Sequence, residues 1–191
     1  MKRVCVFCGA NSGLRPSFAT AARDFGGRLA QAGVGLVYGG GNVGLMGAVA
    51  DGALAQGGEV IGVIPRQLVE RELAHGEVTV MHVVGSMHER KALMADLSDA
   101  FVALPGGYGT LDEFFEILTW AQLGLHDKPC GLLNVEGYFD DLLRFLDRAV
   151  ADGLLQAANR NLFVVGTDTE KLMSELRAAG SRVAIKGGDF R

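Results

Sequence analysis

The sequence predicts one α/β domain in which a doubly wound, Rossmann-like parallel sheet of about seven strands carries helices on both faces. Short apolar runs alternate with longer amphipathic stretches, which is the pattern of repeated β-α-β units. Runs such as Val4–Phe7 and Gly35–Tyr38 are apolar throughout, as strands covered on both faces require. Glycine accounts for 28 of the 191 residues, which indicates many tight turns and close backbone approaches.

The expected strands are the short runs rich in β-branched and aromatic residues. They are Arg3–Gly9, Val34–Tyr38, Glu59–Ile64, Val78–Val84, Ala100–Leu104, Cys130–Asn134 and Leu162–Val165. Most of the intervals between them hold a helix-like stretch, so we expect parallel strands joined by crossover helices. Residues 1–180 are expected to form a single domain, and residues 181–191 a loose C-terminal tail.

The stretches between the strands carry helix start and stop signals. Pro16 occupies a favourable first helical position, and Gly33, Gly57 and Gly180 stand where helices commonly end. The expected helices are Pro16–Ala32, Leu45–Gln56, Ser86–Leu97, Thr110–Leu123, Phe139–Ala151 and Thr169–Ala179. The charged stretch Pro65–Glu72 is typical of a solvated helix.

Charge and hydropathy exclude several classes of partner. The chain has 18 Lys and Arg against 22 Asp and Glu, a formal net charge of −4, without a dense basic cluster. A nucleic-acid polymer is therefore not an expected partner. No apolar run reaches the roughly 18 residues of a membrane span, and the N-terminus lacks a signal-peptide pattern. A small anion held by a few well-placed groups remains compatible with this composition.

The three cysteines predict buried thiols. Cys5-x-x-Cys8 and Cys130 lack the second ligand pair that a zinc site would need. A redox pair normally opens a helix, whereas Cys5 and Cys8 lie in a strand-like run. We therefore expect no metal, and a reducing, cytoplasmic compartment.

In a doubly wound sheet, ligands bind beyond the carboxyl ends of the strands. The loop Gly39–Gly47 after the second strand fits the G-x-G-x-x-G fingerprint of dinucleotide sites. It lies on the second β-α unit, however, and Pro65 and Arg66 stand where an NAD site would have an acidic residue. We expect Gly40 and Gly41 to lie near a nucleotide other than NAD, and a plain glycine-rich turn is the alternative.

The stretch after the fifth strand predicts a phosphate site. Its glycines leave backbone N–H groups unshielded where a helix begins, and the helix terminus adds partial positive charge. The expected ligand-binding residues are Gly106, Gly107, Tyr108, Gly109 and Thr110. The alternative is a capping box in which Thr110 caps the helix and Glu113 makes the return bond. Capping alone does not explain the three glycines.

Arg90 interrupts an apolar helix stripe that it shares with Met87 and Met94. A charge on a buried face is rare unless it is paired, so we expect Arg90 to face an anion or Glu113. An arginine that extends from the helix rim to solvent is the alternative. In the first loop, Ser12 is able to donate a hydrogen bond to a ligand.

Together these segments resemble a known family. GGGNVGLMG and PGGYGTLDE, with MHERKA between them, are similar to motifs of the Lonely Guy proteins. These are cytokinin riboside 5′-monophosphate phosphoribohydrolases, long labelled lysine decarboxylase-like. The resemblance runs from Val4 to about Val165 and includes TWAQLGLHDKP and GLLNVEGYF. It implies hydrolysis of the N-glycosidic bond of an N6-modified AMP to free base and ribose 5-phosphate, and we expect no cofactor.

The resemblance also implies residue roles. Arg90 and Glu113 match the family's RK and PGGxGTxxE positions and would be the catalytic pair. The nucleotide site would be lined by Glu72, Lys91, Thr119 and the Gly107–Thr110 stretch. Asp112 replaces the first acid of the family's Glu-Glu pair. A carboxylate near the anomeric carbon can stabilise an oxocarbenium-like sugar and activate water. We expect Arg90 to lower the pKa of Glu113.

Two other functions remain open, namely a nucleosidase for plain AMP and a non-catalytic nucleotide or cofactor carrier. The presence of Arg90 together with Glu113 favours an enzyme. Lysine decarboxylation would need pyridoxal phosphate on a lysine, and only Lys91 lies near the expected site. The helix after the phosphate loop has apolar residues on more than one face, which predicts a homodimer. These residues are Phe114, Phe115, Leu118 and Trp120.

Overall fold

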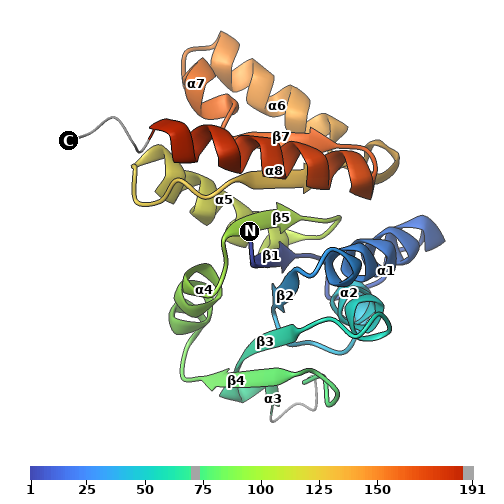
Figure 1. Ribbon diagram of the computed structural model, residues 1–191. Helices are drawn as coiled ribbons and strands as arrows, with labels where there is room; N and C mark the ends of the chain where they lie inside the picture. Colours follow the sequence, from blue (N-terminus) through green and yellow to red (C-terminus); the bar gives the residue numbers. More distant parts are fainter. Residues whose placement is uncertain (70–73, 187–191) are drawn as a thin grey trace.

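The computed structural model describes residues 1–69 and 74–186, and these residues contain a seven-stranded sheet. The strands are β1 (Arg3–Phe7), β2 (Gly35–Tyr38), β3 (Val60–Pro65), β4 (Val80–Val84), β5 (Ala100–Ala103), β6 (Cys130–Leu133) and β7 (Phe163–Gly166). Their order is β4-β3-β2-β1-β5-β6-β7, and every neighbouring pair is parallel. Figure 1 shows this order from bottom to top. The predicted fold class is confirmed.

Helices cover both faces of the sheet. They are α1 (Pro16–Gln31), α2 (Gly44–Leu54), α3 (Arg66–Val69), α4 (Met87–Asp96), α5 (Tyr108–Gln122), α6 (Asp140–Ala151), α7 (Ala157–Arg160) and α8 (Thr169–Lys186), with a 3₁₀ turn, η1, at Val135–Gly137. One core packs α1, α2 and α8 against the sheet, and a second core packs α4, α5 and α6 against the other face. In Figure 1, α1 and α2 lie to the right of the sheet and α4 to its left.

The predicted helix bounds hold to within two residues, except at the C-terminal end of α8. α5 begins at Tyr108, before Thr110, and α8 continues to Lys186, beyond its expected end at Ala179. The expected tail is therefore helical up to Lys186, and residues 187–191 lie outside the described residues. The short elements η1 and α7 carry no periodic pattern and were not predicted.

Glycines allow α1 and α2 to pack closely. A Cβ atom added to Gly26 would lie 2.0 Å from the carbonyl oxygen of Val49, and one added to Gly52 would lie 2.0 Å from that of Arg23. No side chain fits at either position, because the obstructing atoms belong to the backbone. This contact fixes α2, and with it the loop that precedes α2, against the β1 half of the sheet.

The strand order reverses at β1, which has β2 on one side and β5 on the other. The segments that follow β1 and β5 therefore leave the sheet side by side. The N–H of Gly9 donates to the carbonyl of Pro105 at 3.0 Å, and the N–H of Leu104 donates to that of Phe7 at 2.9 Å. Such a switch point is where doubly wound sheets form a ligand crevice.

The cysteines are free thiols in the core, as predicted. Cys5, Cys8 and Cys130 are all buried. Burial raises the pKa of Cys130 to about 12, and it also raises the pKa of the Cys5 and Cys8 thiols.

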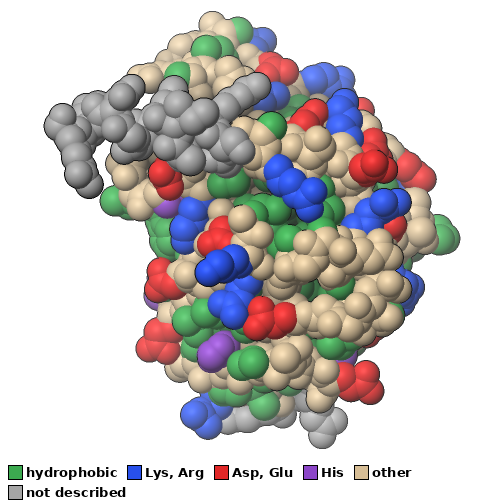
Figure 2. All heavy atoms as spheres, in the orientation of Figure 1, with side chains coloured by type: hydrophobic (Ala, Val, Ile, Leu, Met, Phe, Trp, Pro, Cys, Tyr) green, Lys and Arg blue, Asp and Glu red, His purple; other side chains and the backbone are tan. Residues whose placement is uncertain are grey.

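In the part of the chain that the structure describes, no helix is long and apolar enough to cross a membrane. Positive and negative side chains interleave over the face drawn in Figure 2.

Candidate active site

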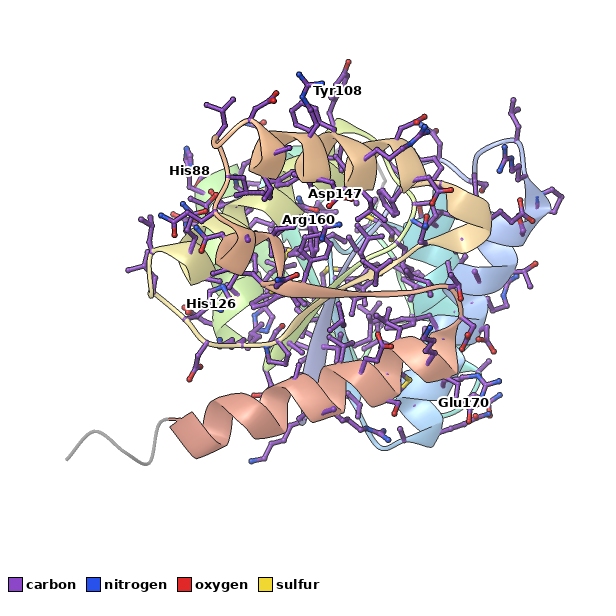
Figure 3. The ribbon with its side chains drawn as sticks, turned by 90° about the horizontal axis from the view of Figure 1, so that it is seen from above. His88, Tyr108, His126, Asp147, Arg160 and Glu170 are labelled. Carbon is purple, nitrogen blue, oxygen red and sulfur yellow. The ribbon has the colours of Figure 1, made fainter. Side chains whose placement is uncertain are left out.

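A pocket of about 470 Å³ opens at the switch point between β1 and β5. Its walls come from the loop after β1, the start of α2, Leu68 of α3, the loop after β5, the first turns of α5, and Tyr138. The predicted site residues that line it are Ser12, Arg90, Gly106, Gly107, Tyr108, Gly109, Thr110 and Glu113. Tyr108 is 96% exposed and projects outward in Figure 3.

The N-terminus of α5 faces this pocket. Its N-cap is Gly107, which has no side chain to cap the helix. The first backbone bond runs from the N–H of Leu111 to the carbonyl of Gly107 at 3.1 Å. The amides of Tyr108, Gly109 and Thr110 precede that bond, so they have no partner within the helix. Thr110 is therefore not the N-cap, and the capping-box alternative for Thr110 and Glu113 is wrong.

Glycine occupies the three positions of this loop for different physical reasons. A Cβ at Gly106 would lie 2.1 Å from Oγ1 of Thr110, so this glycine is needed for packing inside the protein. A Cβ at Gly107 or Gly109 would meet nothing within 4 Å. Neither position has the positive φ that would favour glycine. The protein itself leaves these two positions open, beside unpaired amides at the positive end of a helix dipole.

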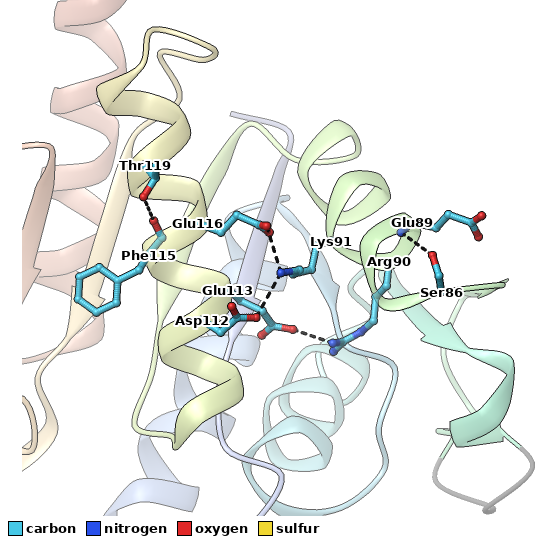
Figure 4. A network of polar contacts seen from close by, with 9 residues as sticks. All are labelled: Ser86, Glu89, Arg90, Lys91, Asp112, Glu113, Phe115, Glu116 and Thr119. Carbon is cyan, nitrogen blue, oxygen red and sulfur yellow. Dashed lines mark hydrogen bonds and ion pairs between the residues drawn. The ribbon is translucent and has the colours of Figure 1, made fainter.

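An arrangement close to a capping box does occur one helix earlier, at the start of α4, where the N-cap is Ser86 and the return bond goes to the residue before it. The N–H of Glu89 donates to Oγ of Ser86 at 3.1 Å, and the carboxylate of Glu89 accepts from the N–H of Gly85 at 2.7 Å. Figure 4 shows the Ser86–Glu89 bond beside Arg90. The box fixes the first turn of α4 and thereby directs Arg90, the next residue, toward the sheet.

Arg90 and Glu113 form a buried ion pair across the pocket floor. Nη1 of Arg90 lies 2.7 Å from Oε1 of Glu113, and each side chain is 9% exposed. Nε of Arg90 also donates to the carbonyl of Val63, within β3, at 3.1 Å. The predicted pairing with Glu113 is thus observed, and an arginine that extends into solvent is wrong. Both residues still line the pocket.

Burial raises the pKa of the Glu113 carboxyl above its ordinary value. The Arg90 guanidinium lowers that pKa but does not offset the desolvation. The expected lowering of the pKa is therefore wrong. The sequence shows the neighbouring positive charge, whereas the depth of the carboxylate is a property of the packed core.

Lys91 lies beside this pair but does not line the pocket. Its ammonium group binds Oδ2 of Asp112 at 3.2 Å and Oε1 of Glu116 at 3.1 Å (Figure 4). Burial alone would lower the pKa of Lys91, but the bonds to Glu116 and Asp112 raise it above its usual value. Lys91 therefore ties α4 to α5, next to the Arg90–Glu113 bond.

Three of the other predicted residues lie away from the pocket. Gly40 and Gly41 hold the chain near residue 75: the carbonyl of Gly40 accepts from the N–H of His75 at 2.9 Å, and Gly41 forms a β-bridge with Ala74. Thr119 is exposed on α5, and its hydroxyl donates to the carbonyl of Phe115. Glu72 lies outside the described residues.

The N-terminus of α2, at the fingerprint loop, is partly occupied by the protein itself. The N–H groups of Leu45 and Met46, at the start of α2, donate to the carbonyl of Gly9 at 2.9 and 3.3 Å. The side chains of Leu45 and Met46 instead contribute apolar wall to the pocket. Gly44, at φ +64°, packs against the backbone of Ala10. This packing brings the loop after β1 and the loop after β2 together at the pocket.

Sequence reasoning missed the aromatic wall. Tyr138 and Phe18 line the pocket and pack edge to face, with ring centroids 5.3 Å apart. The hydroxyl of Tyr138 donates to the carbonyl of Gly106 at 2.7 Å, so it supports the glycine loop from outside. The available signal was the GLLNVEGYF segment, which runs from β6 through η1 to Tyr138 and Phe139. Among the residues that the structure covers, no cluster of three or more His, Cys, Asp or Glu could hold a metal ion.

Comparisons with known proteins identify close relatives. Residues 46–176 match a family model described as "Possible lysine decarboxylase". The chain is 56% identical to a probable cytokinin riboside 5′-monophosphate phosphoribohydrolase, LOGL9, of Oryza sativa subsp. japonica, over 92% of this chain and 77% of that protein. It is 51% identical to the cytokinin riboside 5′-monophosphate phosphoribohydrolase LOG5 of Arabidopsis thaliana, over 93% and 78%.

Solved structures with lower sequence identity share the fold. The Moco carrier protein from Chlamydomonas reinhardtii superposes with a TM-score of 0.72 at 22% identity, covering 95% of this chain and 98% of that one. A molybdenum cofactor binding protein from Rippkaea orientalis gives a TM-score of 0.70 at 24% identity, over 93% and 97%. At this identity the likeness concerns the fold alone.

Proposed function

Because this chain belongs to the family of the cytokinin riboside 5′-monophosphate phosphoribohydrolases, we propose that it hydrolyses the N-glycosidic bond of an N6-modified AMP. Water adds at the anomeric carbon, and the bond to the base breaks. The products are the free base and ribose 5-phosphate. The observation that carries this proposal is the placement of a buried, paired carboxylate and an open helix terminus on one wall of a single pocket.

The open terminus of α5 suits the 5′-phosphate. Three amide groups before the first helical bond offer donors, and the helix dipole favours an anion. Gly107 and Gly109 leave space in which phosphate oxygens can approach the backbone. Gly106 and Thr110 pack against each other and keep this turn in place.

Glu113 lies at a suitable distance from that phosphate site. The helix axis rises about 9 Å between Gly107 and Glu113, and helical side chains point back toward the N-terminus. Oε1 of Glu113 accepts from Arg90, whereas Oε2 accepts no hydrogen bond from any described residue. The second oxygen can therefore stabilise the cationic sugar and take a proton from the attacking water.

Arg90 orients Glu113 and favours its ionised form. Its Nη1 bond fixes one carboxylate oxygen, and its Nε bond to Val63 anchors the guanidinium to the sheet. A carboxylate as deeply buried as Glu113 would otherwise take up a proton. Arg90 thus acts as a positioning partner and also presents nitrogen atoms to the pocket.

The name of the matching family model does not fit the chemistry of this pocket. A Schiff-base lysine has to reach the ligand with a free amine. Lys91, the lysine nearest to the site, is engaged with two carboxylates that raise its pKa, and it does not line the pocket. The phosphoribohydrolase reaction uses the residues that do line it.

A direct assay tests the proposal. The protein is incubated separately with isopentenyl-AMP, AMP and isopentenyladenosine, and the released base is quantified. We expect release from isopentenyl-AMP that is lost in the Glu113→Gln variant. Equal rates with AMP would instead indicate a general nucleotide nucleosidase. Binding of isopentenyl-AMP without release would indicate a carrier.

We also propose a homodimer in the cytoplasm, with a small nucleotide as the ligand rather than a nucleic-acid polymer or a membrane. Leu123 and Leu125, at the end of α5, are 66% and 70% exposed and supply apolar surface for a second copy. Phe114 and Leu118 are buried in the chain's own core and do not contribute. Three free buried thiols support a reducing compartment.

A further inference from the structure

Gly39 directly follows β2 and lies against the guanidinium of Arg90. A Cβ atom at Gly39 would lie 2.1 Å from Nη2 and 3.2 Å from Cζ of Arg90, and 3.0 Å from Sδ of Met46. Its φ is not in the left-handed region, unlike that of Gly40 at +75°. Space, rather than backbone conformation, therefore requires glycine at position 39.

Each nitrogen of the guanidinium has a different environment. Nε is bonded to Val63 and Nη1 to Glu113, so two sides of the group are fixed. Nη2 lies against the Cα of Gly39 and donates to no residue in the described part of the chain. Because Arg90 lines the pocket, Nη2 is the nitrogen left to donate to a ligand oxygen.

We propose that Gly39 is a positioning residue whose missing side chain leaves room at the end of β2 for the Nη2 end of the Arg90 guanidinium, with Nη1 on Glu113 and Nη2 available to the substrate. This inference rests on the proposed function and deepens it. It assigns the first glycine of the fingerprint loop to the catalytic pair rather than to nucleotide binding. The neighbouring Gly40 and Gly41 serve the backbone near residue 75 instead.

A methyl group at position 39 has few ways to be accommodated. Val63 offers a backbone carbonyl in β3, and Glu113 is buried on α5, so neither partner can follow a displaced guanidinium. Displacement of the guanidinium weakens its hydrogen bond to Glu113. The positive charge of Arg90, which lowers the pKa of Glu113, then acts on the carboxyl less strongly. The groups that act on Glu113 are Arg90 and Lys91 of α4, Asp112 of α5, and the thiols of Cys5 and Cys8 of β1 and its following loop.

The test is Gly39→Ala, followed by two readouts. The Glu113 carboxyl is titrated by ¹³C NMR, with its signal assigned by its absence in Glu113→Gln, and kcat and KM are measured with isopentenyl-AMP. We expect the titration to move to higher pH and kcat to fall about 10- to 100-fold. The titration needs no turnover, so it decides the role of Gly39 even if the wild-type protein fails to hydrolyse the nucleotide.

Gly52→Ala is the matched control. Its Cβ would meet the carbonyl of Arg23 at 2.0 Å, an equally close contact between α1 and α2, outside the pocket lining. We expect it to lower thermal stability and leave the titration of Glu113 unchanged. If Gly39→Ala also lowers stability but leaves that titration at the wild-type position, Gly39 is merely structural and the inference is overturned.

A double variant keeps the test decisive if Gly39→Ala does not fold. Lysine has no atom equivalent to Nη2, so Gly39→Ala combined with Arg90→Lys should fold with the melting temperature of Arg90→Lys alone. Such non-additivity is expected for two groups in contact. A double variant that unfolds as readily as Gly39→Ala would show that the obstruction is not Arg90, and would overturn the inference.

Discussion

Arg90 and Glu113 are each about nine-tenths buried, and a single unpaired charge at that depth would be strongly destabilising. Helical periodicity identified Arg90, because a cation among apolar neighbours needs a partner. The position after the glycine loop identified Glu113. The direction of the Glu113 pKa could not be predicted in this way, since desolvation depends on the packing of α4, α5 and β3 around the carboxylate.

Glu113→Gln should abolish most turnover while preserving the fold. The amide oxygen still accepts from Arg90, but it cannot take a proton from water or stabilise a cation as well. We expect turnover to fall about 10²- to 10⁴-fold, measured as base released from isopentenyl-AMP. Glu116→Gln is the control, because Glu116 lies on the same helix, binds Lys91 and does not line the pocket. Near-normal turnover in Glu113→Gln would contradict the assigned role.

The raised pKa of Glu113 sets the expected pH dependence. The ionised carboxylate is the active form, so activity should fall as the pH drops through a value above the ordinary pKa of about 4.5. The fold binds this proton more tightly than the unfolded chain does. Protonated Glu113 therefore stabilises the fold fully at low pH. This stabilisation is lost as the pH rises through the pKa that Glu113 has in the folded protein. Rate profiles and melting temperatures across this range check both signs. If the Glu113→Gln variant keeps the same fall in activity at low pH, that fall belongs to another titrating group.

At the scale of elements, the helix start and stop signals in the sequence predicted which segments are helical better than they predicted where each helix begins and ends. Both Ser86-x-x-Glu89 and Thr110-x-x-Glu113 have the sequence of a capping box, but only in the first does the hydroxyl residue cap its helix, and there the glutamate returns to Gly85. Gly107 is the N-cap of α5, a position that glycine also tolerates, and this places Thr110 inside the helix, where it packs against Gly106. The choice between the two arrangements depends on a contact that sequence alone does not show.

Gly107→Ala and Gly109→Ala should separate stability from binding. A methyl group meets nothing within 4 Å at either position, so the fold should tolerate it. Inside α5, Gly109→Ala should even add about 0.5–1 kcal/mol of stability. Both variants should lower kcat/KM for the 5′-monophosphate by obstructing the phosphate. Gly106→Ala, which clashes with Thr110, should instead melt at lower temperature. Unchanged kcat/KM in both Gly107→Ala and Gly109→Ala would show that the phosphate does not bind at the N-terminus of α5.

Tyr138→Phe should loosen the glycine loop without disturbing the core. The ring keeps its edge contacts with Phe18 and Phe139, but the bond to the carbonyl of Gly106 is lost. We expect about 0.5–1.5 kcal/mol less stability and a KM several-fold higher for the nucleotide. Urea unfolding and steady-state kinetics measure the two effects. A wild-type KM would show that the loop holds its shape without Tyr138.

At the scale of the whole molecule, the β-α alternation was enough to predict the seven strands and their parallel direction. It also predicted that the candidate site lies beyond the carboxyl ends of the strands. It could not predict η1 or α7, because three- and four-residue turns leave no periodic signal. The strand order was also beyond a pattern argument, and that order is what brings the loops after β1 and β5 together.

The expected dimer is a prediction at this scale. Static light scattering at micromolar concentration should give about 40 kDa for two chains of 20.2 kDa each. Leu123→Glu should reduce that mass toward one chain, because it places a charge on exposed apolar surface at the end of α5. Phe145→Glu is a control at an exposed apolar residue on α6. A wild-type mass near 20 kDa would contradict the dimer.

The three buried thiols have a practical consequence for spectroscopy. Cys5 and Cys130 are almost fully shielded, Cys8 is 8% exposed, and burial disfavours the reactive thiolate in all three. The native chain should therefore react slowly with maleimide dyes. A single cysteine introduced at Tyr108, the exposed residue at the pocket mouth, would take up the label in preference to them. A fluorophore attached there would report the arrival and departure of nucleotide in real time, on a protein that needs no prior removal of its own cysteines.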